Sequence, residues 1–183
     1  NYSDFLSFKN IRKLKKILNK TSINQKVKGI GESISKKYIG KNPIFIGVLK
    51  GSFIFTADLL RSIKIDCEVE FIKVQSYKGT QSTGNVKITS DIKTNLKGRH
   101  IIVVEDIIDS GKTIKFLISE FKKKSVKSIS IATFLMKSNQ QKFDFPIDYI
   151  GFEIKQGFVV GYGLDYNQKY RNLDSVYVLE SKN

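Results

Sequence analysis

Three carboxylates lie within five positions of one short segment, VVEDIIDSGKTI, at residues 103–114. Glu105, Asp106 and Asp109 follow a run of β-branched residues and precede the Ser-Gly-Lys-Thr of residues 110–113. Carboxylates can accept hydrogen bonds from hydroxyl groups or bind a metal ion. The hydroxyls and unpaired N–H groups at the start of a helix can bind an anion. The segment therefore suits a phosphorylated sugar, which needs both kinds of contact.

Two other interpretations of this segment require no sugar. A nucleotide-hydrolase phosphate loop needs a glycine where this chain has Asp106, and further acids in the loop would repel a triphosphate. A capped helix start after an acidic turn would explain Ser110. It leaves three adjacent carboxylates with Lys112 as their one basic neighbour in the sequence. The sugar-phosphate interpretation accounts for more of the segment than either alternative.

The elements around the segment alternate between strands and helices. Helical spacing of apolar residues predicts helices near 23–38, 55–60 and 114–121. Apolar or alternating runs predict strands near 44–49, 65–71, 86–90, 100–105, 126–136, 148–154, 158–163 and 176–179. This order predicts an α/β fold with right-handed crossovers and a mostly parallel sheet. Ligands bind at the carboxyl ends of the strands of such sheets, where Glu105 and Asp106 are expected.

Two further segments have distinct patterns. Residues 11–20 carry apolar side chains at helical spacing with lysines between them, which predicts an amphipathic helix. Residues 78–85, KGTQSTGN, contain two glycines and no apolar side chain, which predicts a mobile loop.

The chain is strongly basic, with a net charge of +15 and a sequence pI of about 9.8. Basic proteins often bind nucleic acid. Here the lysines are spread along the whole chain, and arginine, the usual base-reading residue, occurs only at positions 12, 61, 99 and 171. This pattern disfavours nucleic acid as a partner. The same positive field would attract a small polyanionic substrate.

Length and composition predict one domain spanning residues 1–183. No apolar run approaches the ~20 residues of a membrane span, so no membrane partner is expected. No secretory signal is recognised at the start of the sequence. The single cysteine, Cys67, cannot form an internal disulfide, which predicts a reducing, cytoplasmic location. The single histidine, His100, disfavours histidine-based metal clusters and catalytic triads.

The segment 103–113 resembles the phosphoribosyl-diphosphate signature of the purine phosphoribosyltransferases. Residues 47–60, 76–88 and 150–173 resemble, in the same order, segments of the hypoxanthine phosphoribosyltransferases. The resemblance begins near residue 26 and leaves the role of the first 22 residues open. It implies the type I phosphoribosyltransferase fold, a twisted, mostly parallel sheet flanked by helices. It also implies a small hood subdomain, formed by the N- and C-terminal segments.

The resemblance implies a purine-salvage reaction. The 5-phosphoribosyl group of phosphoribosyl diphosphate would pass to N9 of hypoxanthine or guanine, giving IMP or GMP and pyrophosphate, with Mg²⁺ as cofactor. A homodimer or homotetramer is expected from the same resemblance. The alternative is a phosphoribosyltransferase-like regulator that binds nucleic acid. Such relatives often lose the base-recognition residues, whereas Lys137 and Phe158 are present here.

The resemblance also implies roles for the residues of the acidic segment. Glu105 and Asp106 would accept hydrogen bonds from the ribose hydroxyls and help to hold positive charge that develops on the sugar. Asp109 would face N7 of the purine as general base or proton acceptor. The 5′-phosphate would be bound by Ser110, Gly111, Lys112 and Thr113.

Pyrophosphate recognition is implied for a second group of residues. Lys50 and Gly51 would contact this leaving group, and Arg171 would reach it from the far side. Asp165 would help to hold magnesium, together with Glu105 and Asp106. The resemblance further implies a cis peptide bond between Leu49 and Lys50, with main-chain N–H groups facing the anion. A loop that closes over the site would begin at Ser76 and Tyr77.

Base recognition is implied for Lys137, Phe158 and Val159. Lys137 would donate to the 6-oxo group, Phe158 would stack on the purine, and Val159 would offer main-chain contacts. Taken alone, such a lysine is usually a surface residue and such a phenylalanine a core residue. Two positions depart from the family pattern, because Gln141 and Lys26 stand where relatives usually have arginine. The preference among hypoxanthine, guanine and xanthine is not determined by these residues.

Overall fold

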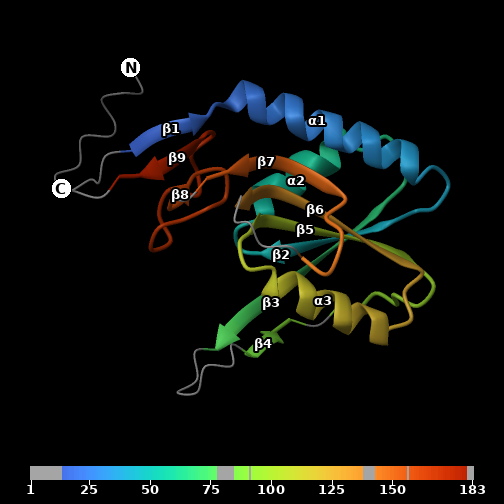
Figure 1. Ribbon diagram of the computed structural model, residues 1–183. Helices are drawn as coiled ribbons and strands as arrows, with labels where there is room; N and C mark the ends of the chain where they lie inside the picture. The colour runs from blue at the N-terminus through green and yellow to red at the C-terminus, as the bar shows by residue number, and fades with distance from the viewer. Residues whose placement is uncertain (1–13, 78–84, 91, 138–142, 156, 181–183) are drawn as a thin grey trace.

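The computed structural model describes residues 14–77, 85–90, 92–137, 143–155 and 157–180. Within these ranges the chain forms a six-stranded sheet with helices on both faces and a separate three-stranded sheet (Figure 1). The helices are α1 (Lys20–Lys37), α2 (Phe53–Ser62) and α3 (Lys112–Lys123). None of these helices is long and apolar enough to cross a membrane.

The large sheet has the strand order β4-β3-β2-β5-β6-β7. Its strands are β2 (Ile44–Leu49), β3 (Glu68–Tyr77), β4 (Asn85–Ile88), β5 (His100–Ile108), β6 (Ser128–Lys137) and β7 (Tyr149–Ile154). All neighbouring strands run parallel except the antiparallel pair β3–β4. The predicted α/β fold with a mostly parallel sheet is therefore confirmed.

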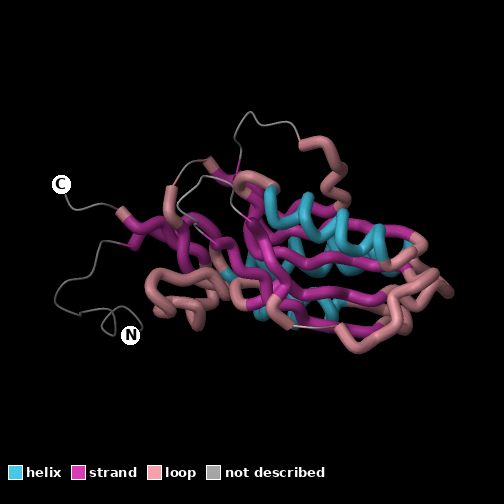
Figure 2. The backbone as a smooth tube through the Cα atoms, turned by 90° about the horizontal axis from the view of Figure 1, so that it is seen from below, coloured by secondary structure: helices cyan, strands magenta, loops and turns pink. Residues whose placement is uncertain are grey.

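Apolar side chains fill both faces of this sheet. On one face α1 and α2 pack over residues such as Phe45, Ile102 and Phe134. On the other face α3 packs over residues such as Ile46 and Val103. Strands covered on both sides need apolar residues at every position, which explains the continuous apolar runs of the central strands. Figure 2 shows the helices packed along the strands and the small sheet at one end of the molecule.

The small sheet joins the two ends of the described chain. It has the order β1-β9-β8, with β1 (Leu14–Leu18), β8 (Val159–Val160) and β9 (Val176–Leu179). The predicted helix over residues 11–20 is therefore wrong for the part that the structure describes. The sequence spacing fits both structures, and pairing with β9 decides between them, since Leu14 lies opposite Leu179 and Leu18 opposite Val176. Helix α1 begins only after Asn19, whose side chain accepts a hydrogen bond from the backbone N–H of Ser22 at 2.9 Å.

Further predicted boundaries need correction. The strand predicted over residues 65–71 is β3, which begins at Glu68 and continues to Tyr77, so the predicted loop start at Ser76 and Tyr77 lies within a strand. Strand β5 does not end at Glu105, because its pairing with β6 continues to Ile108. The strand predicted over residues 158–163 is limited to β8, because positive φ angles at residues 161–163 turn the chain away. The predicted loop at residues 78–85 lies, apart from Asn85, outside the described residues.

Candidate active site

A cavity of about 310 Å³ lies at the carboxyl ends of β2 and β5. This is the edge of a parallel sheet at which ligands are expected. The predicted site residues that it brings together are Lys50, Gly51, Glu105, Asp106, Thr113, Asp165 and Arg171. Val48, Leu49, Val74 and Ile107 complete the lining. The predicted residues in this lining come from three separate parts of the chain, 50–51, 105–113 and 165–171.

The acidic side of the cavity is built on β5. Glu105 is only 7% exposed, and burial together with the neighbouring Asp106 carboxylate raises the pKa of Glu105 well above its usual range. Asp106 accepts a hydrogen bond from the backbone N–H of Ile107 at 3.0 Å. Two carboxyl groups therefore lie side by side at the cavity, where they can contact sugar hydroxyls.

The Lys50-Gly51 turn is packed tightly between two neighbours. A Cβ atom at Gly51 would overlap the carboxylate of Asp106. A Cβ atom at Gly163 would overlap the carbonyl oxygen of Gly51. Only glycine fits at either position without movement of a neighbour. The Leu49–Lys50 peptide bond is cis, which confirms that prediction, while the direction of the nearby N–H groups stays a prediction.

The cations of the cavity are Arg171, from the C-terminal segment, and Lys50, which follows β2. Arg171 Nη1 donates to the carbonyl oxygen of Gly163 at 2.7 Å, and its Nη2 lies 2.9 Å from Asp165 Oδ1. Lys50 Nζ lies 3.4 Å from Gln168 Oε1. Gln168 was not among the predicted site residues. Its only sequence signal is its position between Asp165 and Arg171, which says nothing about a contact with Lys50.

The start of α3 forms a third wall. Its N-cap is Gly111, with a φ of 69°, and a Cβ atom there would overlap the ring of Phe143. The helix start is near the predicted position, but the capping role of Ser110 in the alternative interpretation is wrong, because the cap is Gly111 and makes no side-chain hydrogen bond. Ser110 and Lys112 are exposed, and Thr113 lines the cavity.

Asp109 and Lys137 are not part of the lining of this cavity, but they contact each other directly. Lys137 Nζ lies 2.7 Å from Asp109 Oδ2, and the two side chains are 24% and 52% exposed. Asp109 follows β5 and Lys137 ends β6, so the pair forms where two neighbouring strands end. Phe158 is 52% exposed and meets the ring of Tyr166 edge-on at 5.7 Å, whereas Val159 is buried in β8.

A family model for the phosphoribosyl transferase domain matches residues 13–167 of this chain. The chain belongs to the phosphoribosyltransferase family. The hypoxanthine-guanine phosphoribosyltransferase of Bacillus subtilis (strain 168) is 44% identical to it over 167 residues, covering 91% of this chain and 93% of the relative. The predicted resemblance to this group of enzymes is therefore confirmed.

Solved structures support the same assignment of fold. The hypoxanthine phosphoribosyltransferase of Staphylococcus aureus has a TM-score of 0.86 and 36% identity, covering 91% of both chains. The hypoxanthine-guanine phosphoribosyltransferase of Bacillus anthracis has a TM-score of 0.85 and 41% identity, covering 91% of this chain and 99% of that one. The type I phosphoribosyltransferase fold is thus confirmed, and the regulator alternative is not favoured.

The remaining predictions for this phosphoribosyltransferase concern the closing loop, Gln141, Lys26 and the metal ion. The side chains of Ser76 and Tyr77, the loop that follows them, and Gln141 lie outside the part of the chain that is described. Lys26 is exposed on α1. Among the described residues, no group of three or more His, Cys, Asp or Glu side chains is arranged to hold a metal ion.

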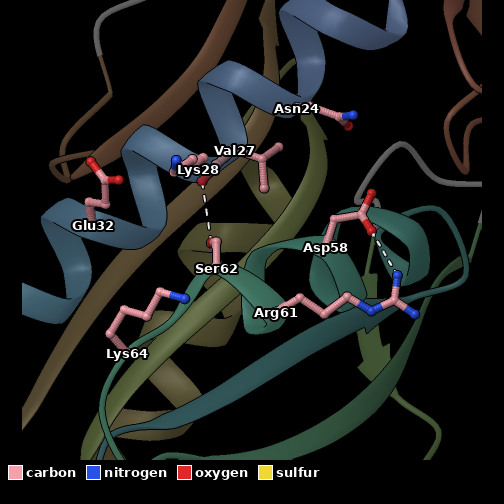
Figure 3. Close-up of a pocket in the computed structure, with 8 residues that line it drawn as sticks. All are labelled: Asn24, Val27, Lys28, Glu32, Asp58, Arg61, Ser62 and Lys64. Carbon is pink, nitrogen blue, oxygen red and sulfur yellow. Dashed lines mark hydrogen bonds and ion pairs between the residues drawn. The ribbon is translucent and has the colours of Figure 1, made fainter.

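A second cavity of the phosphoribosyltransferase, about 280 Å³, lies between α1 and α2 (Figure 3). It contains none of the predicted site residues. On its lining, Asp58 lies 3.4 Å from Arg61, and Asp58 also accepts a hydrogen bond from Tyr162 at 2.8 Å. Burial and Asp58 together raise the pKa of Tyr162. Asp58 thus anchors the segment that carries Asp165, which is a structural function.

Proposed function

We propose that this chain transfers the 5-phosphoribosyl group of phosphoribosyl diphosphate to N9 of hypoxanthine or guanine. The products are IMP or GMP and pyrophosphate, and the role is purine salvage. The observation that carries the proposal is the cavity with carboxyl groups on β5 and the cations Lys50 and Arg171 facing the same space. Relatives named as hypoxanthine-guanine phosphoribosyltransferases support the choice of base.

The carboxyl groups act on the sugar. As pyrophosphate departs, positive charge develops at the ribose ring, as in glycoside chemistry. Asp106 accepts hydrogen bonds from ribose hydroxyls and offsets this charge. Glu105, whose pKa is raised by burial and by the neighbouring Asp106 carboxylate, provides the second carboxyl group beside the ribose hydroxyls. Their positions on a central strand keep them fixed while the sugar moves between leaving group and base.

The two cations contact pyrophosphate, and the start of α3 contacts the 5′-phosphate. Lys50 and Arg171 offset the charge that accumulates on pyrophosphate, and Gly51 lets the backbone approach it closely. The N–H groups of residues 110–113 bind the 5′-phosphate, with the Ser110 and Thr113 hydroxyls. Lys112 adds positive charge from the exposed side.

Magnesium fits this donor set. Mg²⁺ in proteins is commonly held by one or two carboxylates together with substrate phosphates, and it supplies positive charge to the departing diphosphate. Asp165 would help to hold this ion, together with Glu105 and Asp106. Both Asp165 oxygens already accept contacts, from Arg171 at 2.9 Å and from the Gln168 N–H at 2.8 Å. Each carboxylate oxygen keeps a second lone pair for a metal.

The purine base binds at the Asp109–Lys137 pair. Lys137 donates to the 6-oxo group, and adenine, which presents an amino group there, is disfavoured. Asp109 accepts the proton that N7 holds as the new bond forms at N9. Phe158 is exposed enough to stack on the ring, and Val159 offers its main chain. Ser76 and Tyr77, at the end of β3, precede the segment that would close over the site and exclude water.

We infer a single domain over residues 1–183, with the small β1-β9-β8 sheet as the hood. The free thiol of Cys67 supports a cytoplasmic location. A homodimer or homotetramer is expected, and light scattering on the purified protein measures it directly.

The experiment supplies phosphoribosyl diphosphate and magnesium with hypoxanthine, guanine, xanthine or adenine, in the absence of nucleic acid. We expect pyrophosphate release with the first two bases and little with adenine. Arg171→Gln should lose most of this activity, whereas Arg61→Gln, at the second cavity, is the matched control and should retain it. Absence of pyrophosphate release with all four bases would refute the proposed function.

A further inference from the structure

Gln168 sits on a tight two-residue turn beside the cavity. Tyr166 and Lys169 exchange backbone hydrogen bonds of 3.1 and 3.0 Å, and the two residues between them have φ angles of 50° at Asn167 and 65° at Gln168. Two successive residues with positive φ form the tightest hairpin turn. The turn therefore fixes the direction in which the Gln168 side chain leaves the backbone.

The side chain and backbone of Gln168 contact three charged residues of the site. Its Oε1 lies 3.4 Å from Lys50 Nζ and 3.3 Å from Arg171 Nη2, and its N–H donates to Asp165 Oδ2 at 2.8 Å. Lysine and arginine side chains can only donate, so the amide must turn its oxygen to both. One acceptor oxygen thus lies between two cations from distant parts of the chain.

The Gln168 oxygen reduces the repulsion between Lys50 and Arg171 in a site for a polyanion. Two cations aimed at one cavity repel each other and tend to point apart. A partial negative charge between them reduces that repulsion. Because glutamine is neutral, both formal positive charges remain for the substrate. Asp165, by contrast, offsets part of the Arg171 charge directly.

We propose that Gln168 is a positioning residue for the diphosphate group. It holds the Lys50 ammonium and the Arg171 guanidinium convergent without itself contacting the reacting atoms. The inference rests on the proposed function for the identity of the anion. It predicts that Gln168 affects the diphosphate end of the substrate and not the purine end.

Two substitutions separate this role from a structural one. Gln168→Met keeps the length of the side chain and removes the amide oxygen, whereas Gln168→Glu keeps an acceptor oxygen on the same stem. Gln25→Met, at an exposed position on α1, is the matched control for the methionine itself. Melting temperatures of all variants show whether any fails to fold.

The measurements are calorimetric binding of magnesium pyrophosphate and the KM values of both substrates. For Gln168→Met we expect about five- to tenfold weaker pyrophosphate binding and an equal rise in the KM of phosphoribosyl diphosphate. The KM of hypoxanthine and the melting temperature should stay near those of the unmodified chain. Gln168→Glu should bind pyrophosphate more tightly than Gln168→Met, because the acceptor is kept, but less tightly than the unmodified chain, because its negative charge offsets the two cations.

The outcomes distinguish this proposal from the function on which it rests. Pyrophosphate binding by Gln168→Met equal to that of the unmodified chain would overturn it, as would a Gln168→Glu variant as impaired as Gln168→Met. If the unmodified chain binds magnesium pyrophosphate but turns over no base, the proposed function fails while the positioning role is still measured by binding. If it binds no pyrophosphate, both proposals fail.

Discussion

Replacing Gly51 by alanine should impair the enzyme through Asp106 and leave the backbone almost unaffected. Gly51 does not have a positive φ, so alanine is compatible with its conformation. The added Cβ would overlap Oδ2 and Cγ of Asp106 and lie 3.2 Å from its Cβ. The Asp106 side chain is the flexible partner in this contact, so we expect it to rotate away from the cavity.

The magnitude follows from what Asp106 would lose. Rotation removes its hydrogen bond with the Ile107 N–H and its proposed contact with the ribose. A hydrogen bond to a charged group contributes about 1.5–3 kcal/mol. If the ribose contact is lost in the transition state, kcat/KM for phosphoribosyl diphosphate should fall roughly 10- to 150-fold.

Gly29→Ala is the control for this experiment. Gly29 is exposed on α1, and a Cβ atom there would meet nothing within 4 Å. Alanine in a helix interior is about 1 kcal/mol more favourable than glycine, so this variant should be slightly more stable and fully active. The assay is pyrophosphate release over a range of phosphoribosyl diphosphate concentrations. A Gly51→Ala variant with normal stability and unchanged kcat/KM would refute the reasoning, because the Asp106 position would then be unimportant.

Three other expectations concern the acids and the base pocket. Asp109→Asn should lower the single-turnover rate by ~10²–10⁴-fold while nucleotide binding survives, and a rate near normal would show that Asp109 is not the base. Lys137→Gln should weaken hypoxanthine use by about 1.5–3 kcal/mol and narrow the gap to adenine, so an unchanged ratio of the two kcat/KM values would remove Lys137 from base recognition. The third expectation concerns the raised pKa of Glu105 in the folded chain. At pH values between the ordinary glutamate pKa of ~4.3 and this raised pKa, the Glu105 carboxyl is ionised in the unfolded chain and protonated in the folded chain. Glu105 therefore makes stability fall as pH rises through that window, and Glu105→Gln should lessen the fall when urea unfolding is compared at about pH 5 and about pH 8; identical pH dependence in both proteins would contradict this.

The central elements could be predicted because their signals are local. The apolar run of β5 and the helical spacing of α3 depend only on burial of neighbouring residues. Strand β1 could not be predicted in this way, since its structure depends on β9 at the other end of the chain. Local spacing was compatible with a helix, and tertiary pairing overrode it.

In the site too, contacts between residues close in sequence could be predicted and contacts between distant residues could not. The acids and the helix start are contiguous in sequence, so their proximity follows from one strand and one turn. The contact of Gln168 with Lys50 joins residues 118 positions apart and depends on a turn with two positive φ angles. The cis bond at Leu49–Lys50 was predicted only through the family resemblance, because no pattern in the residues themselves specifies it.

The strand order of the small sheet has a consequence for folding of the site during translation. Strand β9, the last strand among the described residues, lies between β1, the first of them, and β8. The acids on β5 emerge from the ribosome before the loop with Asp165 and Arg171, which lies between β8 and its partner strand β9. At roughly 5–20 residues per second, several seconds separate the two events. During this interval β1 has an unpaired edge, and the α1 and α2 core lacks Val159, Tyr162 and Val176. A nascent chain at this stage would be a target for chaperones and for proteases, and it would gain Asp165 and Arg171 of the proposed diphosphate site only later.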